Sequence, residues 1–264
     1  MSRVPSLSSP FLIGFDQIER ALDRVAKAAD DAAGLGVAEA LRAASHSATV
    51  AARNINDGIS IIAVAESSTN EVTSILVRIR ELAIQSASDT LANTERAYIQ
   101  TEYVQLASEI NRIANVTEFN GVSLTNGSVT FMNVQVGIQN TSNDRIVINL
   151  GDLRSTVLAV DTASMSLATA TGAQGAITNI DAALQVVSTN RSTFGAVENR
   201  LNSALNNIEA YTESTIAAES RIRDADFGFE TAQLAQNQIL QQAGVSVLSQ
   251  AKNINQSALA LLQS

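Results

Sequence analysis

The fold is decided by residues 93–115, which read NTERAYIQTEYVQLASEINRIAN. Apolar side chains recur in this stretch at alternating steps of four and three residues, at Ile99, Tyr103, Leu106, Ile110 and Ile113. The spacing places them on one face of an α-helix and is typical of a coiled-coil seam. Thr94 is a candidate N-cap, because a threonine hydroxyl can accept a hydrogen bond from a free N–H of the first turn. The stretch therefore predicts a helix that packs along one side.

Two longer stretches, at residues 30–88 and 174–223, have similar apolar spacing. The first contains Ile55, Ile59, Ile62, Val72, Leu76, Ile79 and Leu82, and the second contains Ile177, Ile180, Leu184, Val187, Phe194, Leu201, Leu205 and Ile208. In the second stretch Arg191 occupies a stripe position, and the phase slips near Val197. No proline follows Pro10, so no proline ring interrupts either stretch. Three helices with one apolar face each predict a mainly α protein whose helices bury these faces against one another.

The period changes to two between the second and third helical stretches. Apolar residues there alternate with their neighbours, at Met132, Val134, Val136, Ile146, Ile148 and Leu150. Turn-forming residues lie at Asn126-Gly127 and at 140–144. Residues 119–150 are therefore predicted to form a small β-hairpin region of one or two hairpins. The segment at 158–175 is rich in Ala, Ser, Thr and Gly and is predicted to be an irregular exposed connection.

The last stretch, from residue 229 onward, combines an apolar stripe with an almost complete lack of charge. Between Glu230 and Ser264 the only charged residue is Lys252. The stripe consists of Leu240, Gly244, Val247, Ala251, Ile254, Ala258 and Leu261. Because a free amphipathic helix normally has a charged face, this helix is suited to contact on most of its sides. We predict that the stripe forms an assembly core; the alternative is a tail that packs on its own domain.

Composition excludes several classes of function. The 264-residue chain has no Cys, one His (His46) and a formal net charge of −9. These counts exclude disulfides, thiolate chemistry and a His/Cys metal site. The negative charge argues against nucleic acid, whose phosphates require clustered Lys and Arg, and no apolar run reaches the roughly 18 residues of a membrane span. The adjacent Asp30 and Asp31 are better explained as favourable charges at a helix N-terminus than as an acid/base pair. We predict no enzyme activity, no cofactor, no metal, and neither a nucleic-acid nor a membrane partner.

Several blocks of sequence resemble the bacterial flagellins. They include DDAAGL at 30–35, ARNINDGIS at 52–60, RIANVTEFNG at 112–121 and QILQQAGVSVL at 238–248. Each block is weak by itself, but they follow one another in the family's order over residues 30–264. Residues 1–29 differ, since MSRVPSLSSPF and the segment after it resemble the N-terminal arm of small heat-shock proteins. A chaperone function would rest on those residues alone.

The resemblance implies a long antiparallel helical hairpin that forms a coiled-coil rod. Residues 1–32 with 225–264 would be the terminal helices of an inner tube, called D0. Residues 33–224, with β-hairpins at about 119–150, would be the helical rod, called D1. The implied function is that of a structural subunit that self-assembles into the bacterial flagellar filament for motility. A hook–filament junction (hook-associated) protein, which shares the terminal architecture, is the alternative.

The resemblance also implies a location and partners. The chain would be secreted and would lie in the extracellular flagellar filament, with other copies of itself as its main partner. The flagellar export apparatus, an export chaperone, and the hook-associated and cap proteins would be further partners. In flagellins, the positions that match Arg78, Leu82 and Glu102 contact the innate immune receptor TLR5. The same three residues are therefore a candidate receptor contact here.

Overall fold

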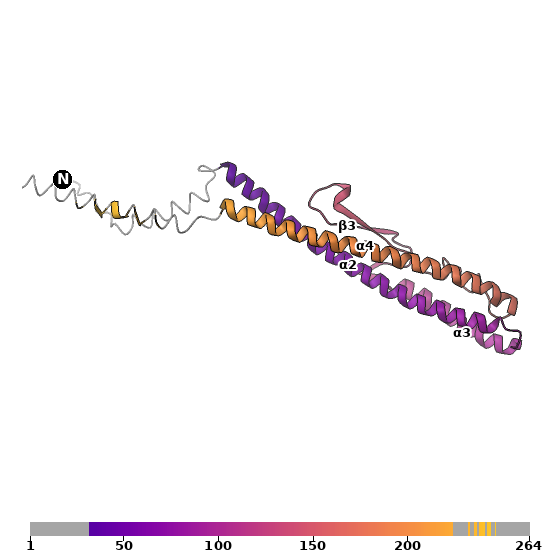
Figure 1. The fold of residues 1–264 in the computed structure, drawn as a ribbon. Helices are drawn as coiled ribbons and strands as arrows, with labels where there is room; N and C mark the ends of the chain where they lie inside the picture. The colour runs from indigo at the N-terminus through magenta and orange to yellow at the C-terminus, as the bar shows by residue number, and fades with distance from the viewer. Residues whose placement is uncertain are drawn as a thin grey trace, which may run out of the picture. The chain divides into compact units, whose positions relative to one another are not determined.

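The computed structural model describes residues 32–223 and single helical positions between 232 and 246. Three helices dominate it: α2 (Ala32–Ser86), α3 (Asn93–Val116) and α4 (Ala170–Arg223) (Figure 1). The mainly α fold and the three helical stretches are confirmed, each to within a few residues. The chain divides into two compact units, a smaller one of residues 1–43 and 214–264 and a larger one of residues 44–213. The predicted D0 and D1 boundaries remain predictions.

In the larger unit α2 and α4 run antiparallel. Arg80 of α2 forms an ion pair with Asp181 of α4 at 2.7 Å, and Glu66 forms one with Arg191 at 3.7 Å, so residue numbers fall on one helix as they rise on the other. A first core lies where α3 joins them, and it includes Leu76, Ile79, Ile99, Tyr103, Ile110, Ile180 and Val187. The predicted stripes therefore face one another, as their spacing requires.

A second core lies between α2, α4 and a β-hairpin. Strand β3 (Phe131–Gln135) pairs antiparallel with β4 (Arg145–Asn149), and a short 3₁₀ turn, η1 (Ser142–Asp144), precedes β4. Val134, Ile146 and Ile148 point into a core that also contains Ile55, Ile62, Phe194 and Leu201. At Gly58 a Cβ would lie 3.0 Å from the side chain of Val134, so the absence of a side chain lets the hairpin approach α2 closely.

A second and smaller antiparallel pair consists of β1 (Glu118–Phe119) and β2 (Val122–Ser123). Its turn has Asn120 at φ 50° and Gly121 at φ 75°, the left-handed backbone that a two-residue turn of this kind needs. The prediction of one or two small hairpins in this region is confirmed.

Two local predictions are wrong. The segment between β4 and α4 is irregular, but it is not simply exposed: Leu153, Leu158, Val160, Met165 and Leu167 are all buried in the first core. These side chains follow no regular period, so a search for helical or strand spacing cannot find them.

Helix α3 is not capped by the Thr94 hydroxyl. Its N-cap is Ala92, whose N–H donates to the Glu95 carboxylate at 2.5 Å.

Candidate assembly and receptor surfaces

Arg78 and Glu102, two of the three predicted receptor residues, lie together on the surface of the larger unit. The Arg78 side chain on α2 donates to the Glu102 carboxylate on α3 at 2.9 Å and to Glu81 on its own helix at 2.9 Å. These bonds, chiefly the one to Glu102, raise the pKa of the Arg78 guanidinium. About half of the Arg78 side chain is exposed. The pair is thus an exposed cation and anion held in a fixed position by each other.

Leu82, the third predicted receptor residue, does not share that surface. It is only 2% exposed and packs in the first core. Arg78 and Leu82 are one helical turn apart, but an offset of four residues still rotates the side chain about the helix axis by roughly 40°. Leu82 is therefore buried while Arg78 is exposed, and the assignment of the three residues to a receptor contact stays a prediction. In the folded unit Leu82 packs in the first core beneath the surface that carries Arg78 and Glu102. The Arg78 and Glu102 side chains are accessible to a partner, whereas that of Leu82 is not.

Of the predicted assembly core, only Leu240 falls within the part of the chain that the structure describes. It is helical and 62% exposed, and its neighbour Ile239 is 65% exposed. Gly244, Val247, Ala251, Ile254, Ala258 and Leu261 lie outside the described residues. The assignment of the stripe to an assembly core stays a prediction.

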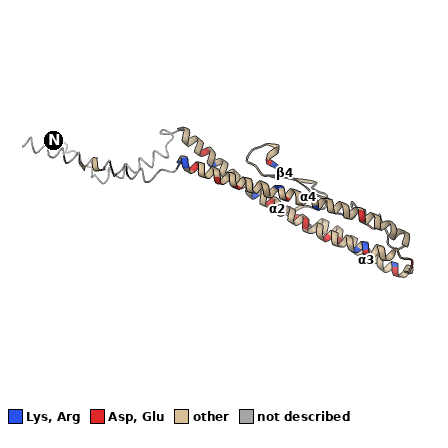
Figure 2. Ribbon diagram, in the orientation of Figure 1, with Lys and Arg blue, Asp and Glu red and all other residues tan. Residues whose placement is uncertain are grey.

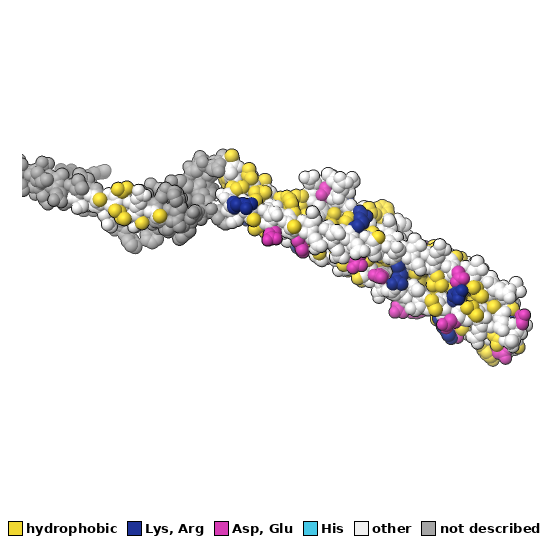
Figure 3. Space-filling model, in the orientation of Figure 1, with side chains coloured by type: hydrophobic (Ala, Val, Ile, Leu, Met, Phe, Trp, Pro, Cys, Tyr) yellow, Lys and Arg dark blue, Asp and Glu magenta, His cyan; other side chains and the backbone are white. Residues whose placement is uncertain are grey.

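The smaller unit exposes further apolar side chains that the sequence reasoning did not single out. Val37 of α2 and Ile216 and Ile222 of α4 are between 43% and 51% exposed. Among the described residues of this unit, the buried side chains are Ala38 and Thr215. Figure 3 shows hydrophobic side chains reaching the surface among polar ones, and Figure 2 shows charges of both signs scattered along the helices. Ile222 lies on the four–three spacing that runs through Leu201, Leu205 and Ile208, whereas Ile216 lies one residue off it, beside the buried Thr215.

Within residues 32–223 and the helical positions beyond them, no three His, Cys, Asp or Glu side chains could hold a metal ion together. In the first core the pKa of the Tyr103 hydroxyl is strongly raised, mainly because the group is buried and secondly because of the negative charge of Asp161. This hydroxyl donates to the Val160 carbonyl at 3.1 Å, a packing contact between α3 and the irregular segment. In the described part of the chain no helix is long and apolar enough to span a membrane.

Two family models match the chain. The bacterial flagellin N-terminal helical region matches residues 23–130, and the bacterial flagellin C-terminal helical region matches residues 177–262. The first match includes Arg78 and Glu102, and the second includes the whole predicted assembly stripe. Residues 1–22 lie outside both.

Relatives and a solved structure agree with these matches. The chain is 39% identical to a flagellin of Halalkalibacterium halodurans and 37% identical to a flagellar filament core protein of Brachyspira hyodysenteriae, in each case over 91% of this chain and 88% of the relative. The crystal structure of Bacillus cereus flagellin is 32% identical, with a TM-score of 0.52 over 59% of this chain and 88% of that one. On these matches the chain belongs to the bacterial flagellins, a family of structural filament subunits and not of enzymes.

Proposed function

We propose that copies of this chain associate through the apolar side chains of the smaller unit and so build an extracellular flagellar filament. The observation that carries the proposal is the exposure of Val37, Ile216, Ile222, Ile239 and Leu240 in the single chain. All five residues belong to the smaller unit, and exposed apolar surface marks sites of association. The relatives named above are a flagellin and a flagellar filament core protein, and neither is a hook-associated protein.

The lack of charge near the C-terminus supports the same proposal. Residues 231–264 contain one charged side chain, Lys252. Burying an unpaired charge in an interface costs roughly several kcal/mol. A segment almost without charges can therefore be enclosed by neighbouring copies at little electrostatic cost. Gln, Asn and Ser at the remaining positions can hydrogen-bond to a neighbouring copy.

Leu240→Asp tests the proposal, because it places a carboxylate in the apolar stripe at a position that is exposed in the single chain. Purified monomer should fail to form filaments that sediment or appear by electron microscopy, while its thermal unfolding stays unchanged. Leu240→Met, which keeps the apolar character, is the matched control and should polymerise. Normal filaments from Leu240→Asp would show that this stripe is not the assembly surface.

A second proposal concerns the receptor. Arg78 and Glu102 present an ordered cation and anion on the surface, and both ends of that pair could form charge-assisted hydrogen bonds with TLR5. The double variant Arg78→Ala with Glu102→Ala should weaken signalling by monomer in reporter cells. Arg112→Ala with Glu109→Ala removes another exposed ion pair, on α3, and is the control. Equal responses from the two double variants would remove the assignment.

We also propose, from the flagellin relatives alone, that the chain leaves the cell through the flagellar export apparatus with the help of an export chaperone. In the filament it would meet hook-associated and cap proteins at the two ends. Deleting the export apparatus in the source organism should leave the chain inside the cell. Its appearance in the medium of such a strain would contradict export by that route.

A further inference from the structure

The two cores of the larger unit do not merge. On α2 the second core ends at Ala65 and the first begins at Val72; on α4 the corresponding residues are Phe194 and Val187. The connecting segment after β4 divides in the same way, since Leu150 belongs to the second core and Leu153 to the first. The break therefore crosses the whole unit.

Polar or small residues occupy the break. On α2, Ser68 and Thr69 are buried at positions where the stripe would otherwise hold apolar side chains. On α4 the half-buried Asn190 lies at the corresponding turn, next to the exposed Arg191, and a Cβ at Gly151 would overlap the amide of Asn190. A further buried hydroxyl, that of Thr125, lies on the chain between β2 and β3. We call this set, namely Ser68, Thr69, Thr125, Gly151, Asn190 and Arg191, the polar layer.

The hydroxyls of α2 in this layer do not join the two helices. Ser68 and Thr69 both donate back to the Ala65 carbonyl of their own helix, at 2.8 and 2.6 Å. Among the described residues, the ion pair that connects α2 and α4 at this level is Arg191 with Glu66, at 3.7 Å with both side chains well exposed. An exposed pair of this kind contributes little to stability. On α2 and α4 neither apolar cluster includes a residue of this layer, and the ion pair printed between the helices at this level is an exposed one.

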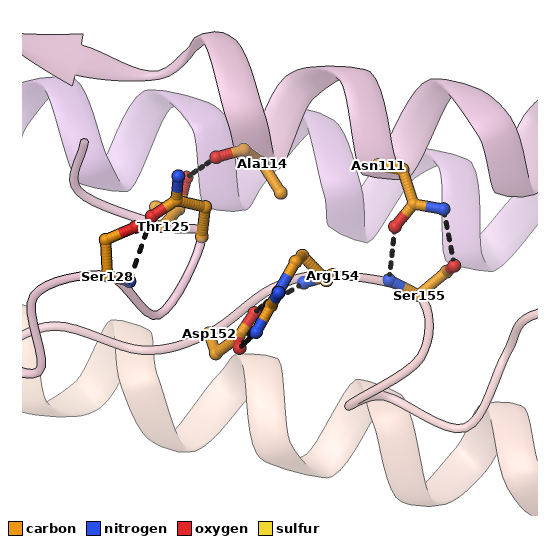
Figure 4. Close-up of polar contacts among 8 residues, drawn as sticks. Asn111, Ala114, Thr125, Ser128, Asp152, Arg154 and Ser155 are labelled. Carbon is orange, nitrogen blue, oxygen red and sulfur yellow. Dashed lines mark hydrogen bonds and ion pairs between the residues drawn. The ribbon is translucent and has the colours of Figure 1, made fainter.

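The remaining contacts at this level are made by the connecting chain (Figure 4). The Thr125 hydroxyl donates to the Ala114 carbonyl near the end of α3 at 3.1 Å. The Asn111 side-chain NH₂ donates to the Ser155 hydroxyl at 2.8 Å, and the Asn111 side-chain oxygen accepts from the Ser155 backbone N–H at 2.9 Å. Asp152 and Arg154 pair with each other two residues apart. The bonds of Thr125 and Asn111 fix the crossing loops to α3.

We propose that the polar layer is a joint that divides the larger unit into two packing modules that open separately. The first core with α3 forms one module, and the second core with the β3–β4 hairpin forms the other. Serine and threonine side chains bonded to the preceding turn of their own helix favour bending there. At Ser68 and Thr69 such bonds coincide with the gap between the two cores. Subunits of a helical polymer can then adjust one module while the other keeps its contacts.

Hydrogen exchange on the full-chain monomer in low urea tests the joint. Leu76 and Leu201 are fully buried leucines, one in each core, and thus form a matched pair. Leu76→Ala should speed amide exchange at 75–83 and 103–110 by about 100-fold while 55–62 and 201–208 change little, and Leu201→Ala should do the reverse. Equal acceleration of both cores by either variant would overturn the proposal.

A second experiment replaces two polar residues of the layer with apolar ones. Thr69→Val with Asn190→Leu makes the apolar stripe continuous, and in this background the effect of Leu76→Ala should spread to both cores. Thr189→Val is the control, because Thr189 makes the same bond to its own helix, to the Gln185 carbonyl at 2.9 Å, but is exposed. In the Thr189→Val background the effect should stay confined to one core. Confinement in the double-variant background as well would show that the polar layer is not what separates the modules.

Discussion

The same two helices behave differently in the two units. In the larger unit α2 and α4 bury Ile55, Leu76, Ile180 and Leu201 completely, because α3, the irregular segment or the hairpin covers their apolar faces. In the smaller unit the described turns of the same helices bury Ala38 and Thr215 and leave larger aliphatic side chains exposed. Two helices by themselves enclose only small side chains between them. A third surface has to cover the rest, and in the smaller unit we assign that surface to a neighbouring copy.

The largest effect should come from one substitution made in both units. Ile62 is fully buried in the second core, whereas Ile216 is 50% exposed. Ile62→Ala should lower the free energy of unfolding of the monomer by about 2–5 kcal/mol, and Ile216→Ala by less than about 0.5 kcal/mol. Urea denaturation followed by circular dichroism measures both. Similar losses at the two positions would break the comparison, since they would mean that the smaller unit covers Ile216 in the single chain.

A smaller loss of stability should show whether a polar contact helps to hold the irregular segment after β4 on the first core. Tyr103→Phe keeps the ring but removes the hydroxyl that donates to the Val160 carbonyl, and both residues are fully buried. An unpaired buried carbonyl should lower the free energy of unfolding by about 1–3 kcal/mol. Tyr98→Phe, on an exposed side chain of the same helix, should have almost no effect. If Tyr103→Phe is equally silent, the irregular segment is held by apolar contact alone.

Ala159→Gly should stabilise the same segment. Ala159 is exposed and has φ 53°, a left-handed conformation that costs an L-residue about 1–2 kcal/mol. Glycine removes that strain but adds about 0.4–1 kcal/mol of unfolded-state entropy, so a net gain near 0.5 kcal/mol is expected. Ala163→Gly, in the same segment without a positive φ, should be destabilising in the same denaturation assay. A loss of stability in both variants would argue that Ala159 is not strained.

The smallest expected effect depends on pH. Hydrogen bonds from Arg154 lower the pKa of Asp152 below its unfolded value, so the contribution of Asp152 to stability is present above about pH 4 and is lost as pH falls through the folded pKa. Asp152→Asn should therefore reduce the difference between urea midpoints at pH 7 and pH 3. Asp89→Asn, in the exposed turn between α2 and α3, serves as the control. An unchanged pH difference in Asp152→Asn would show that the ion pair with Arg154 adds nothing to the larger unit.

Much of this architecture follows from the sequence. The four–three spacing of α3 and the stripes of α2 and α4 predict the helices, because a helix must turn its apolar positions to one side. Alternation at 131–149 predicts the hairpin for the corresponding reason. In the sequence, Arg191 stands at a stripe position of α4 and the phase slips near Val197. The gap between the two cores, with Ser68 and Thr69 buried on α2, becomes evident only when the helices are aligned.

The sequence by itself determined the helices, the hairpin region, the absence of Cys chemistry and, through its blocks, the flagellin family. Only the tertiary structure decided that Leu82 lies beneath Arg78 in the core, that the segment after β4 covers α3 and α4, and that one polar layer crosses α2, α4 and the connecting chain. The physical reason is that periodicity reports which side of a segment is apolar and depends only on neighbours along the chain. Burial depends on what covers that side, and the covering residues come from distant and irregular parts of the sequence.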